Sequence, residues 1–324
     1  MQKKYALIGA AGYIAPRHMD AIARNNGDLV AAYDLTDSVG RLDAHFPNAQ
    51  FFVNFERFAA YLDKLKKQGR GADMVSICSP NYMHKSHIQF ALRDGMDAIC
   101  EKPLVLDPED IDDLVELEKA TGRKVNTILQ LRLHPAIVKL RETVQADTTG
   151  TIYDAELTYV TRRGQWYYES WKGDVSRSGG IASNIGVHFF DTLSFVFGPL
   201  KRNVVHHRAM DCAAGYLEFE RARVRWFLSI NGRDKDEGEG FARRCLDIPG
   251  VGFYDFSKGF EDLHAVSYAE IVNGRGFPLT EVRPSIAAVA RIRDAAIERG
   301  IGSEHPMVAR VLADKDRYRD GYPV

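Results

Sequence analysis

The stretch KYALIGAAGYIA, residues 4–15, begins as a short apolar strand and continues into a glycine-rich turn. A helical pattern follows over residues 16–25, so the segment predicts a unit of strand, turn and helix. Glycines such as Gly9 and Gly12 let the backbone bend sharply and approach a pyrophosphate, whose charge is met by amide groups at the helix N-terminus. Because Ala11 replaces the second glycine of a strict GxGxxG motif, the turn alone is equally consistent with a structural turn.

Further strands and helices alternate after this unit. Apolar runs typical of buried strands cover Leu29–Tyr33, Met74–Cys78, Asp97–Cys100 and Val125–Leu131, and helical patterns cover His84–Arg93 and Pro108–Thr121. This alternation predicts an α/β fold whose first domain is a Rossmann-type, doubly wound parallel sheet. We place this domain at residues 1–124, and the run from Val125 is its last strand if the boundary lies a few residues later.

The pattern changes in the second predicted domain, residues 125–324. Tyr153, Ala155, Leu157 and Tyr159 fall on one face of an alternating run, and Ala222–Ile230 repeats the alternation. Such runs are typical of an antiparallel sheet with one covered face, so we expect an α+β domain with an open, mostly antiparallel sheet. Its predicted helices are Pro135–Val144, Ile185–Phe197 and Ser285–Arg299.

Charge and hydropathy exclude several kinds of partner. The chain has 43 Lys+Arg against 44 Asp+Glu, so no global positive field attracts nucleic acid or an anionic membrane. Its four cysteines lie far apart without CxxC spacing, which fits a reducing cytoplasm. The sequence shows neither a long apolar stretch nor a signal-like N-terminal segment. We therefore expect a soluble, cytoplasmic chain that binds neither nucleic acid nor membrane.

Asp34 ends the second predicted strand, 22 residues after Gly12. At that position of a dinucleotide-binding fold, a carboxylate accepts hydrogen bonds from the adenosine ribose and repels a 2′-phosphate. The residue therefore favours NAD over NADP as the cofactor. The alternative is a turn acid or a helix cap, and Arg41 is the nearby cation that complicates the preference.

Three polar residues are candidates for alcohol oxidation, which needs a hydride acceptor and a base within hydrogen-bond reach of the hydroxyl. Lys102 follows a buried strand, where it can reach bound cofactor, and His188 is of the residue type whose unperturbed pKa lies near neutrality. Asn184 lies four residues before His188, so on a helix the two share a face. The alternatives are an exposed lysine, an interior histidine and a capping asparagine. Asp191, one turn beyond His188, either orients the imidazole or forms a salt bridge elsewhere.

Other constellations point to weaker hypotheses. His84 and His87 have ligand-like spacing but no cysteine or carboxylate in a recognised pattern, so we predict no metal. Ser183 lies outside any GxSxG elbow, which argues against serine hydrolase chemistry. Aromatic and basic residues between 162 and 172 suit either a nucleotide-sugar surface or a subunit contact, and the predicted substrate contacts are Arg132, Arg163, Tyr167, Lys172, Asn184 and His188.

Several motifs together resemble the Gfo/Idh/MocA oxidoreductase family over nearly the whole chain. They are Gly9–Ala15, Asp34, Ser79-Pro80-Asn81 with His84, Glu101-Lys102-Pro103, Gln130-Leu131-Arg132 and the segment Gly179–His188. Within that family the chain most resembles the dehydrogenases of UDP-N-acetyl-2-amino-2-deoxyglucuronate. The more specific stretches are Gly12–His18, Leu129–Pro135, Trp171–Asp174 and Asp262-Leu263-His264.

This resemblance implies a Rossmann domain, a C-terminal domain for substrate binding and oligomerisation, and commonly a homotetramer. It implies that NAD contacts Gly9, Gly12, Tyr13, Ile14, Asp34, Ser79, Asn81, His84, Glu101, Lys102 and Gln130. Glu101 is expected beside the nicotinamide ribose or its amide, and Lys102 is expected to be the site lysine. The commoner family pattern has aspartate where Asn184 stands, and an amide cannot accept a proton. The role of base therefore shifts toward His188, assisted by Lys102.

The activity implied is oxidation of the C3 hydroxyl of UDP-N-acetylglucosaminuronate (UDP-GlcNAcA) to a 3-keto sugar. The resemblance further implies that NADH is reoxidised in place by 2-oxoglutarate, and that the product serves bacterial surface polysaccharide (O-antigen) synthesis. Two alternatives stay open: a dehydrogenase of a free sugar or inositol, and a non-catalytic sensor of NAD or nucleotide sugars. The presence of both Lys102 and His188 argues against the sensor.

Overall fold

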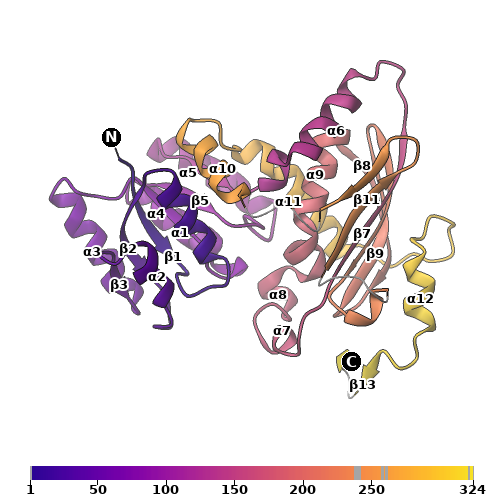
Figure 1. The fold of residues 1–324 in the computed structure, drawn as a ribbon, viewed down its shortest axis with the longest axis horizontal. Helices are drawn as coiled ribbons and strands as arrows, with labels where there is room; N and C mark the ends of the chain where they lie inside the picture. The colour runs from indigo at the N-terminus through magenta and orange to yellow at the C-terminus, as the bar shows by residue number, and fades with distance from the viewer. Residues whose placement is uncertain (1, 237–241, 257–258, 260–261, 320–321, 324) are drawn as a thin grey trace. The chain divides into compact units, whose positions relative to one another are not determined.

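The computed structural model describes residues 2–236, 242–256, 259, 262–319 and 322–323 (Figure 1). The chain divides into two compact units, Met1–Gln130 with Asp262–Arg283, and Leu131–Glu261 with Pro284–Val324. This division differs from the predicted one in two places. Residues 125–130 belong to the first unit, and so does a late segment that the sequence pattern placed in the second.

The first unit is built on a parallel sheet of six strands in the order β3-β2-β1-β4-β5-β6. This is the strand order of a dinucleotide-binding Rossmann fold, so the predicted fold of the first domain is confirmed. Tyr5, Ala6, Leu7 and Ile8 of the central strand are all buried, because helices cover both faces of such a sheet. The strands are β1 Lys4–Ile8, β2 Asp28–Tyr33, β3 Gln50–Phe52, β4 Met74–Ile77, β5 Asp97–Cys100 and β6 Val125–Thr127.

The helices of the first unit come from two separate parts of the chain. The early ones are α1 Ala15–Arg24, α2 Gly40–His45, α3 Phe55–Lys67, η1 Asn81–Met83, α4 His84–Arg93 and α5 Glu109–Thr121. Helix α10, Leu263–Val272, returns from late in the chain and packs against α1. Ala265, Tyr268 and Ile271 of α10 lie in one apolar cluster with Met19 and Ile22 of α1. This apolar contact explains why the late segment belongs to the first unit.

The second unit contains a sheet in the order β12-β11-β7-β10-β9-β8. Its strands are β7 Tyr153–Thr161, β8 Leu200–Arg208, β9 Cys212–Phe219, β10 Ala222–Ser229, β11 Ala242–Ile248 and β12 Gly252–Asp255. Among the described strands of this sheet, only the central pair β7 and β10 is parallel, so the predicted open, mostly antiparallel sheet is confirmed. Trp226 of β10 is buried against Phe190, whereas Arg223 and Arg225 point to the exposed face.

Helices and short segments complete the second unit. They are η2 Gln130–Leu133, whose first residue belongs to the first unit, α6 Pro135–Ala146, α7 Trp166–Glu169, α8 Val175–Ser178, the π-helical turn η3 Ala182–Gly186, α9 Val187–Phe197, η4 Gly232–Asp234, α12 Met307–Ala313, β13 Tyr318–Arg319 and β14 Tyr322–Pro323. Among the described residues, no helix combines the length and the apolar character needed to cross a bilayer.

The last long helix corrects one predicted boundary. Helix α11 spans Leu279–Asp294, whereas the sequence pattern predicted Ser285–Arg299. Pro284 lies inside the helix rather than before it, in its second turn. At the other end, Arg208 donates to the carbonyl oxygens of Ile292 and Ala295, which satisfies acceptors that a helix end leaves open.

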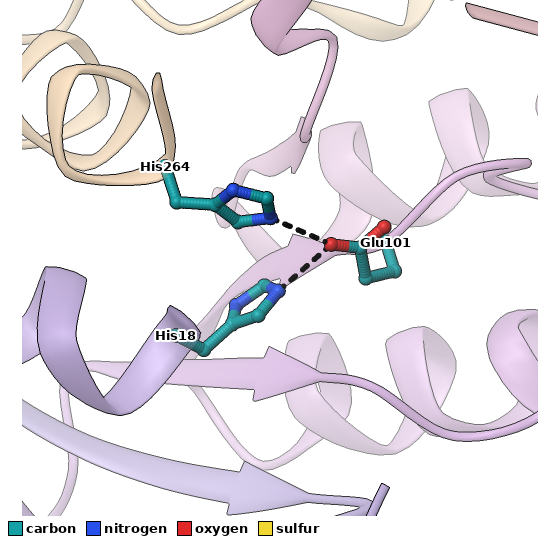
Figure 2. A group of neighbouring side chains, drawn as sticks. All are labelled: His18, Glu101 and His264. Atoms are coloured by element: carbon teal, nitrogen blue, oxygen red, sulfur yellow. Dashed lines mark hydrogen bonds and ion pairs between the residues drawn. The ribbon is translucent and has the colours of Figure 1, made fainter. Parts of the chain in front are cut away.

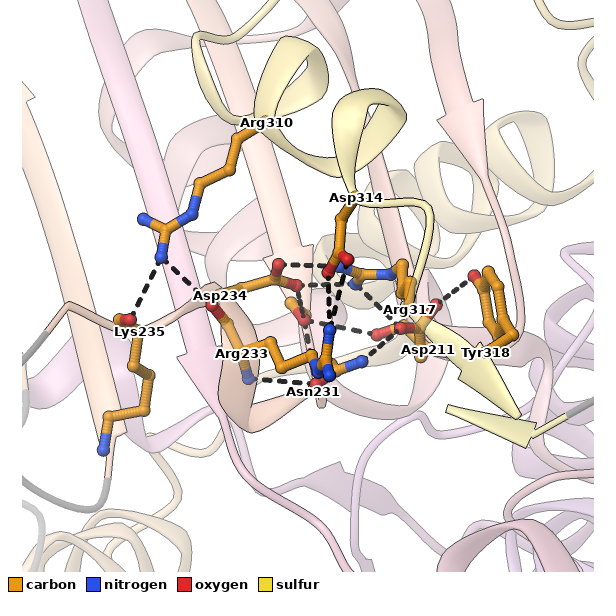
Figure 3. A network of polar contacts seen from close by, with 10 residues as sticks. Asp211, Asn231, Arg233, Asp234, Lys235, Arg310, Asp314, Arg317 and Tyr318 are labelled. Atoms are coloured by element: carbon orange, nitrogen blue, oxygen red, sulfur yellow. Dashed lines mark hydrogen bonds and ion pairs between the residues drawn. The ribbon is translucent and has the colours of Figure 1, made fainter. Parts of the chain in front are cut away.

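A buried polar network attaches the C-terminal segment to the sheet of the second unit (Figure 3). Arg317 pairs with Asp234 at 2.6 Å and with Asp211 at 2.7 Å. Tyr318 and Asn231 also donate to Asp211, at 2.7 and 3.0 Å. One guanidinium therefore pairs with two buried carboxylates and holds Arg317 and Tyr318, which follow α12, against the sheet.

Replacing Arg317 by methionine removes the guanidinium that both carboxylates share. We expect the free energy of unfolding of the second unit to fall by about 3–5 kcal/mol, the usual cost of breaking a buried ion pair. Urea unfolding followed by tryptophan fluorescence measures it. The matched control is Arg223→Met, because Arg223 pairs with Asp154 on the exposed face and its loss costs about 1 kcal/mol or less. Equal losses in the two variants would contradict the role of Arg317.

Candidate active site

The glycine turn joins the C-terminal ends of three neighbouring strands in the first unit. Gly9 has φ +87° and donates its amide to the carbonyl of Tyr33 at 2.8 Å. A Cβ atom on Gly9 would lie 2.6 to 2.8 Å from backbone atoms of Cys78 and Ser79. Only glycine fits, because both the dihedral angle and the space exclude a side chain. The turn thus has the close packing and the following helix that a pyrophosphate site requires.

Asp34 is oriented by the same turn. Its Oδ2 accepts a hydrogen bond from the amide of Ala11 at 2.9 Å, and its Oδ1 accepts one from Thr36 at 3.1 Å. The turn role that the sequence left open is therefore present. A carboxylate offers about four lone-pair sites, so these two bonds leave acceptor capacity for ribose hydroxyls. The turn and the carboxylate together fit NAD.

His84 links two loops at the same edge of the sheet. Its Nδ1 and Nε2 each lie 2.8 Å from a carbonyl oxygen, of Pro103 and of Ser79 respectively. Burial lowers the pKa of His84, and the two carbonyls oppose that shift. The residue is 1% exposed. Through its contacts with the two carbonyls, it connects the Ser79 loop to the loop that carries Lys102.

The remaining predicted NAD residues differ in exposure. Asn81 and Gln130 are buried, Ile14 is partly buried against the core, and Tyr13 is 93% exposed. Ser79 Oγ lies 2.8 Å from Nδ1 of His87. Family resemblance selected these positions, and they stay predictions for cofactor contact.

Glu101 lies in a buried cluster that the sequence pattern did not predict. Its Oε1 lies 3.0 Å from Nε2 of His18 and 3.0 Å from Nε2 of His264 (Figure 2). Its Oε2 accepts the backbone amide of Lys102 at 3.2 Å. Burial alone would raise the pKa of the Glu101 carboxyl, but the bonds from the two imidazoles hold it well below its usual value. The Lys102-Pro103 peptide bond is cis.

The second unit places Asn184 and His188 on consecutive helical segments. Asn184 lies in the π-helical turn η3, and His188 lies in the first turn of α9. Asn184 donates through Nδ2 to the hydroxyl of Tyr167 at 2.7 Å. Burial raises the pKa of Tyr167, so its hydroxyl stays protonated. Turns of the π type occur frequently at functional sites, which supports a role for this segment.

Arg132 and Asp191 form a buried ion pair in the second unit. Two nitrogens of the guanidinium contact the two carboxylate oxygens at 2.8 and 2.7 Å. The guanidinium also lies 4.9 Å from the ring centroid of Phe195. Asp191 thus forms the salt bridge that the sequence left as an alternative to orienting His188. Arg132, which was predicted to contact substrate, is therefore paired with Asp191 inside the protein.

Basic and aromatic residues between 162 and 172, other than the buried Tyr167, form a surface around Lys172 in the second unit. The Nζ atom of Lys172 lies 4.2 Å from the Trp171 ring centroid and 5.7 Å from that of Trp166, whose side chain is exposed. Arg163 donates to Thr161 at 3.2 Å. Cations beside exposed aromatic rings suit a ligand with a flat base and phosphates.

The arrangement supplies two sets of groups. The first unit presents a glycine turn, Asp34 and Lys102 at one edge of a parallel sheet, where open α/β sheets bind their ligands. The second unit presents Asn184, His188 and the surface around Lys172. Sequence reasoning missed His18 and His264 as partners of Glu101. Both histidines lie in stretches recognised as specific, Gly12–His18 and Asp262-Leu263-His264, but neither histidine was given a role.

Family models match two parts of the chain. Residues 3–128 match the oxidoreductase family GFO_IDH_MocA, NAD-binding Rossmann fold, and residues 141–237 match its C-terminal alpha/beta domain. Among curated proteins, D-glucoside 3-dehydrogenase of Escherichia coli is 31% identical over 140 residues, which are 42% of this chain and 39% of that protein. The chain spans between a third and about half of the length of the first curated relatives that it matches.

Two solved structures are similar over almost the whole chain. Both are of the WlbA (WbpB) dehydrogenase from Thermus thermophilus, one in complex with NAD and alpha-ketoglutarate and one with NAD and UDP-GlcNAcA. Each is 45% identical and covers 94% of this chain and 100% of the solved chain, with TM-scores of 0.91 and 0.90.

Replacing Gly9 by alanine tests the turn. The added Cβ would displace the backbone at Cys78 and Ser79, so we expect NAD to bind at least about tenfold more weakly, a cost of about 1.4 kcal/mol. Isothermal titration calorimetry measures the Kd. Gly122→Ala is the control, because Gly122 also has positive φ (+68°) but has no atom near its Cβ position. Unchanged NAD binding in Gly9→Ala, with the protein folded, would count against the site.

Proposed function

Because this chain belongs to the Gfo/Idh/MocA family of oxidoreductases, we propose that it is an NAD-dependent dehydrogenase that oxidises the C3 hydroxyl of UDP-GlcNAcA to a 3-keto sugar. The observation that carries the proposal is the 45% identity, over 94% of the chain, to a dehydrogenase solved with NAD and UDP-GlcNAcA. The glycine turn, Asp34 and Lys102 supply the matching chemistry in the first unit.

The backbone of the glycine turn in the first unit fits a bound NAD. The turn after β1 leaves no room for a side chain at Gly9, and α1 presents its N-terminus there. Bound NAD supplies the hydride acceptor for the sugar carbon. Asp34 binds the ribose hydroxyls, and its negative charge disfavours a 2′-phosphate.

The proton of the hydroxyl is taken by side chains of this chain. His188 accepts it, and Lys102 donates to or shares a proton with the same oxygen. Asn184 orients the hydroxyl, because an amide can form hydrogen bonds to it without accepting its proton. Arg163 and Lys172 bind the UDP group. Tyr167, also predicted to contact substrate, is 1% exposed and accepts a hydrogen bond from Asn184, so it supports that residue.

Finer points of the proposal rest on the same relatives. The dehydrogenase solved with alpha-ketoglutarate supports reoxidation of NADH by 2-oxoglutarate in this chain as well. We further propose a cytoplasmic homotetramer that serves the synthesis of bacterial lipopolysaccharide (O-antigen) sugars. The near balance of 43 basic and 44 acidic residues supports small-molecule partners over nucleic acid.

A second candidate is a dehydrogenase of a free sugar or polyol. It is favoured by the similarity to D-glucoside 3-dehydrogenase and to inositol 2-dehydrogenase of Rhizobium meliloti, 29% identical over 200 residues. Incubation with NAD, 2-oxoglutarate and a panel of sugars separates the two candidates by product mass. UDP-GlcNAcA should yield 2-hydroxyglutarate and a keto sugar, whereas turnover of glucosides or inositol alone would favour the second candidate.

Replacing Lys102 by alanine should lower kcat by about 10²–10⁴-fold, the range typical of a lost proton-transfer group. NAD should bind within about threefold of wild type, because the glycine turn is untouched. Initial rates and calorimetry measure the two effects. Lys119→Ala is the control, since Lys119 is exposed and pairs with Glu116. Near-normal turnover in Lys102→Ala would overturn the assignment.

Replacing Asp34 by asparagine keeps an acceptor for the Ala11 amide but removes the charge. We expect the ratio of the NADP Kd to the NAD Kd to fall at least about tenfold, since repulsion of the 2′-phosphate is lost. Calorimetry with both cofactors measures the ratio. Asp37→Asn, an exposed acid in the same loop, should leave it unchanged, and an equal fall in that control would argue against Asp34 as the selecting residue.

A further inference from the structure

Glu101 receives hydrogen bonds from two helices that are far apart in the sequence. His18 comes from α1, the helix after the glycine turn, and His264 comes from α10 (Figure 2). The exposures of His18, Glu101 and His264 are 0, 6 and 1%. A carboxylate is costly to bury unless it is paired and hydrogen-bonded. The buried Glu101 carboxylate therefore depends on its hydrogen bonds from both histidines.

The hydrogen bonds continue beyond His18. Its Nδ1 lies 2.7 Å from the hydroxyl of Tyr268, one helical turn after His264. The same hydroxyl lies 2.6 Å from Oγ of Ser76 on β4. The network, defined as Ser76, Tyr268, His18, Glu101 and His264, thus connects β4, α1, α10 and the end of β5.

The protons in this network can be assigned from donors and acceptors. If Tyr268 donates to Nδ1 of His18, then Nε2 of His18 carries its proton and donates to Glu101. His264 donates to the same oxygen through its own Nε2. Burial lowers the pKa of His18 despite its bonds to Glu101, which agrees with a neutral imidazole. The carboxylate is therefore an anion that accepts a hydrogen bond from each of the two imidazoles.

The other oxygen of Glu101 acts on Lys102. Oε2 accepts a hydrogen bond from the Lys102 backbone amide at 3.2 Å. Strand β5 ends at Cys100, and Glu101 and Lys102 follow it directly. His18 and His264 fix the carboxylate, and the carboxylate fixes the amide from which the lysine side chain projects. The helix that begins at the glycine turn is connected in this way to the strand end that carries Lys102.

The same three side chains also have the composition of a metal site. Glu101 Oε1 and the two Nε2 atoms lie within 4.8 Å of one another. A metal would need both Nε2 lone pairs, and would turn the Nδ1 of His264, a buried atom without a hydrogen-bond partner, into an orphaned donor. A three-ligand zinc site normally keeps a fourth position open to water or substrate, whereas all three side chains here are buried. Hydrogen bonding satisfies the cluster better.

The buried network is also poorly suited to conducting protons to solvent. Ser76 at one end and His264 at the other are 0 and 1% exposed. The geometry points to a fixed scaffold.

We propose that His18, Tyr268 and His264 are positioning residues for Lys102, which act by holding the Glu101 carboxylate against the Lys102 amide. The inference rests on the proposed function only in taking Lys102 as the lysine of the reaction. It assigns a task to His18 and His264, the residues of the specific stretches Gly12–His18 and Asp262–His264 that the dehydrogenase chemistry leaves without a role.

The test compares His264→Leu with His264→Gln in the NAD-loaded, full-length enzyme. Glutamine can supply an amide donor in place of Nε2–H, and leucine cannot. We expect the Lys102 amide to exchange with deuterium at least tenfold faster in His264→Leu, as measured by mass spectrometry. In the same variant kcat should fall at least tenfold while KM for UDP-GlcNAcA stays within twofold. His264→Gln should recover both kcat and amide protection to within threefold of wild type.

Tyr268→Phe provides a second variant that keeps the ring volume and removes only the hydroxyl. It should show the same two effects, in smaller measure, with the fold intact. His305→Leu is the matched control, because His305 is also buried and hydrogen-bonded, to Thr158 in the second unit. It should lower the Tm while changing neither Lys102 exchange nor kcat by more than twofold.

Three results would overturn the proposal: unchanged Lys102 exchange in His264→Leu, equal impairment by leucine and glutamine, or one equivalent of tightly bound metal lost on substitution of His264. The exchange measurement needs no substrate. An enzyme inactive on UDP-GlcNAcA would therefore refute the proposed function while leaving the exchange result to decide the positioning role.

Discussion

The first unit depends on one buried carboxylate, Glu101, whose charge must be met inside the protein. Its donors are His18 and His264, which lie 83 and 163 residues away in the sequence. This requirement, together with the apolar contact of α1 and α10, explains why a helix from late in the chain completes the Rossmann unit. The carboxylate is stable as an anion because two imidazoles and a backbone amide donate hydrogen bonds to it. Removing one of these donors would leave a buried charge partly unpaired, which is more costly than the net stabilisation from a typical hydrogen bond.

Around that carboxylate, loops from adjacent strands are joined by short contacts. Gly9 packs against the backbone of Cys78 and Ser79, leaving no room for a side chain. His84 bonds to the carbonyl oxygens of Ser79 and Pro103. The ends of β1, β4 and β5 therefore form one continuous structure at the edge where parallel sheets bind ligands. A cofactor bound at the glycine turn and a lysine at the end of β5 are consequently held in a defined relation within a single unit.

Local features of this structure could be predicted from the sequence, and distant pairings could not. The strand and glycine turn of residues 4–15, Asp34 and the lysine after β5 follow from patterns within a few residues. The pairing of Arg132 with Asp191 joins residues 59 apart, and the bonds of Glu101 to two histidines join still more distant ones. The hydrophobic periodicity of a sequence does not predict contacts between residues so far apart. The start of α11 was misplaced for a different reason, because Pro284 suggests a helix start but lies in the second turn. Family resemblance marked His18 and His264 as specific without revealing what they bind.

The second unit contains Asn184, His188 and the surface around Lys172, to which the proposed function assigns the substrate. The central claim is that hydride leaves C3 of a UDP-sugar for the cofactor at the glycine turn. The most direct measurement uses UDP-GlcNAcA carrying deuterium at C3 in a single turnover with NAD, followed by mass spectrometry of the reduced cofactor. The account predicts that the cofactor gains one deuterium and that the turnover rate shows a primary isotope effect if hydride transfer limits it. Deuterium that remains in the sugar, or that is lost to water while the cofactor gains only hydrogen, would contradict it.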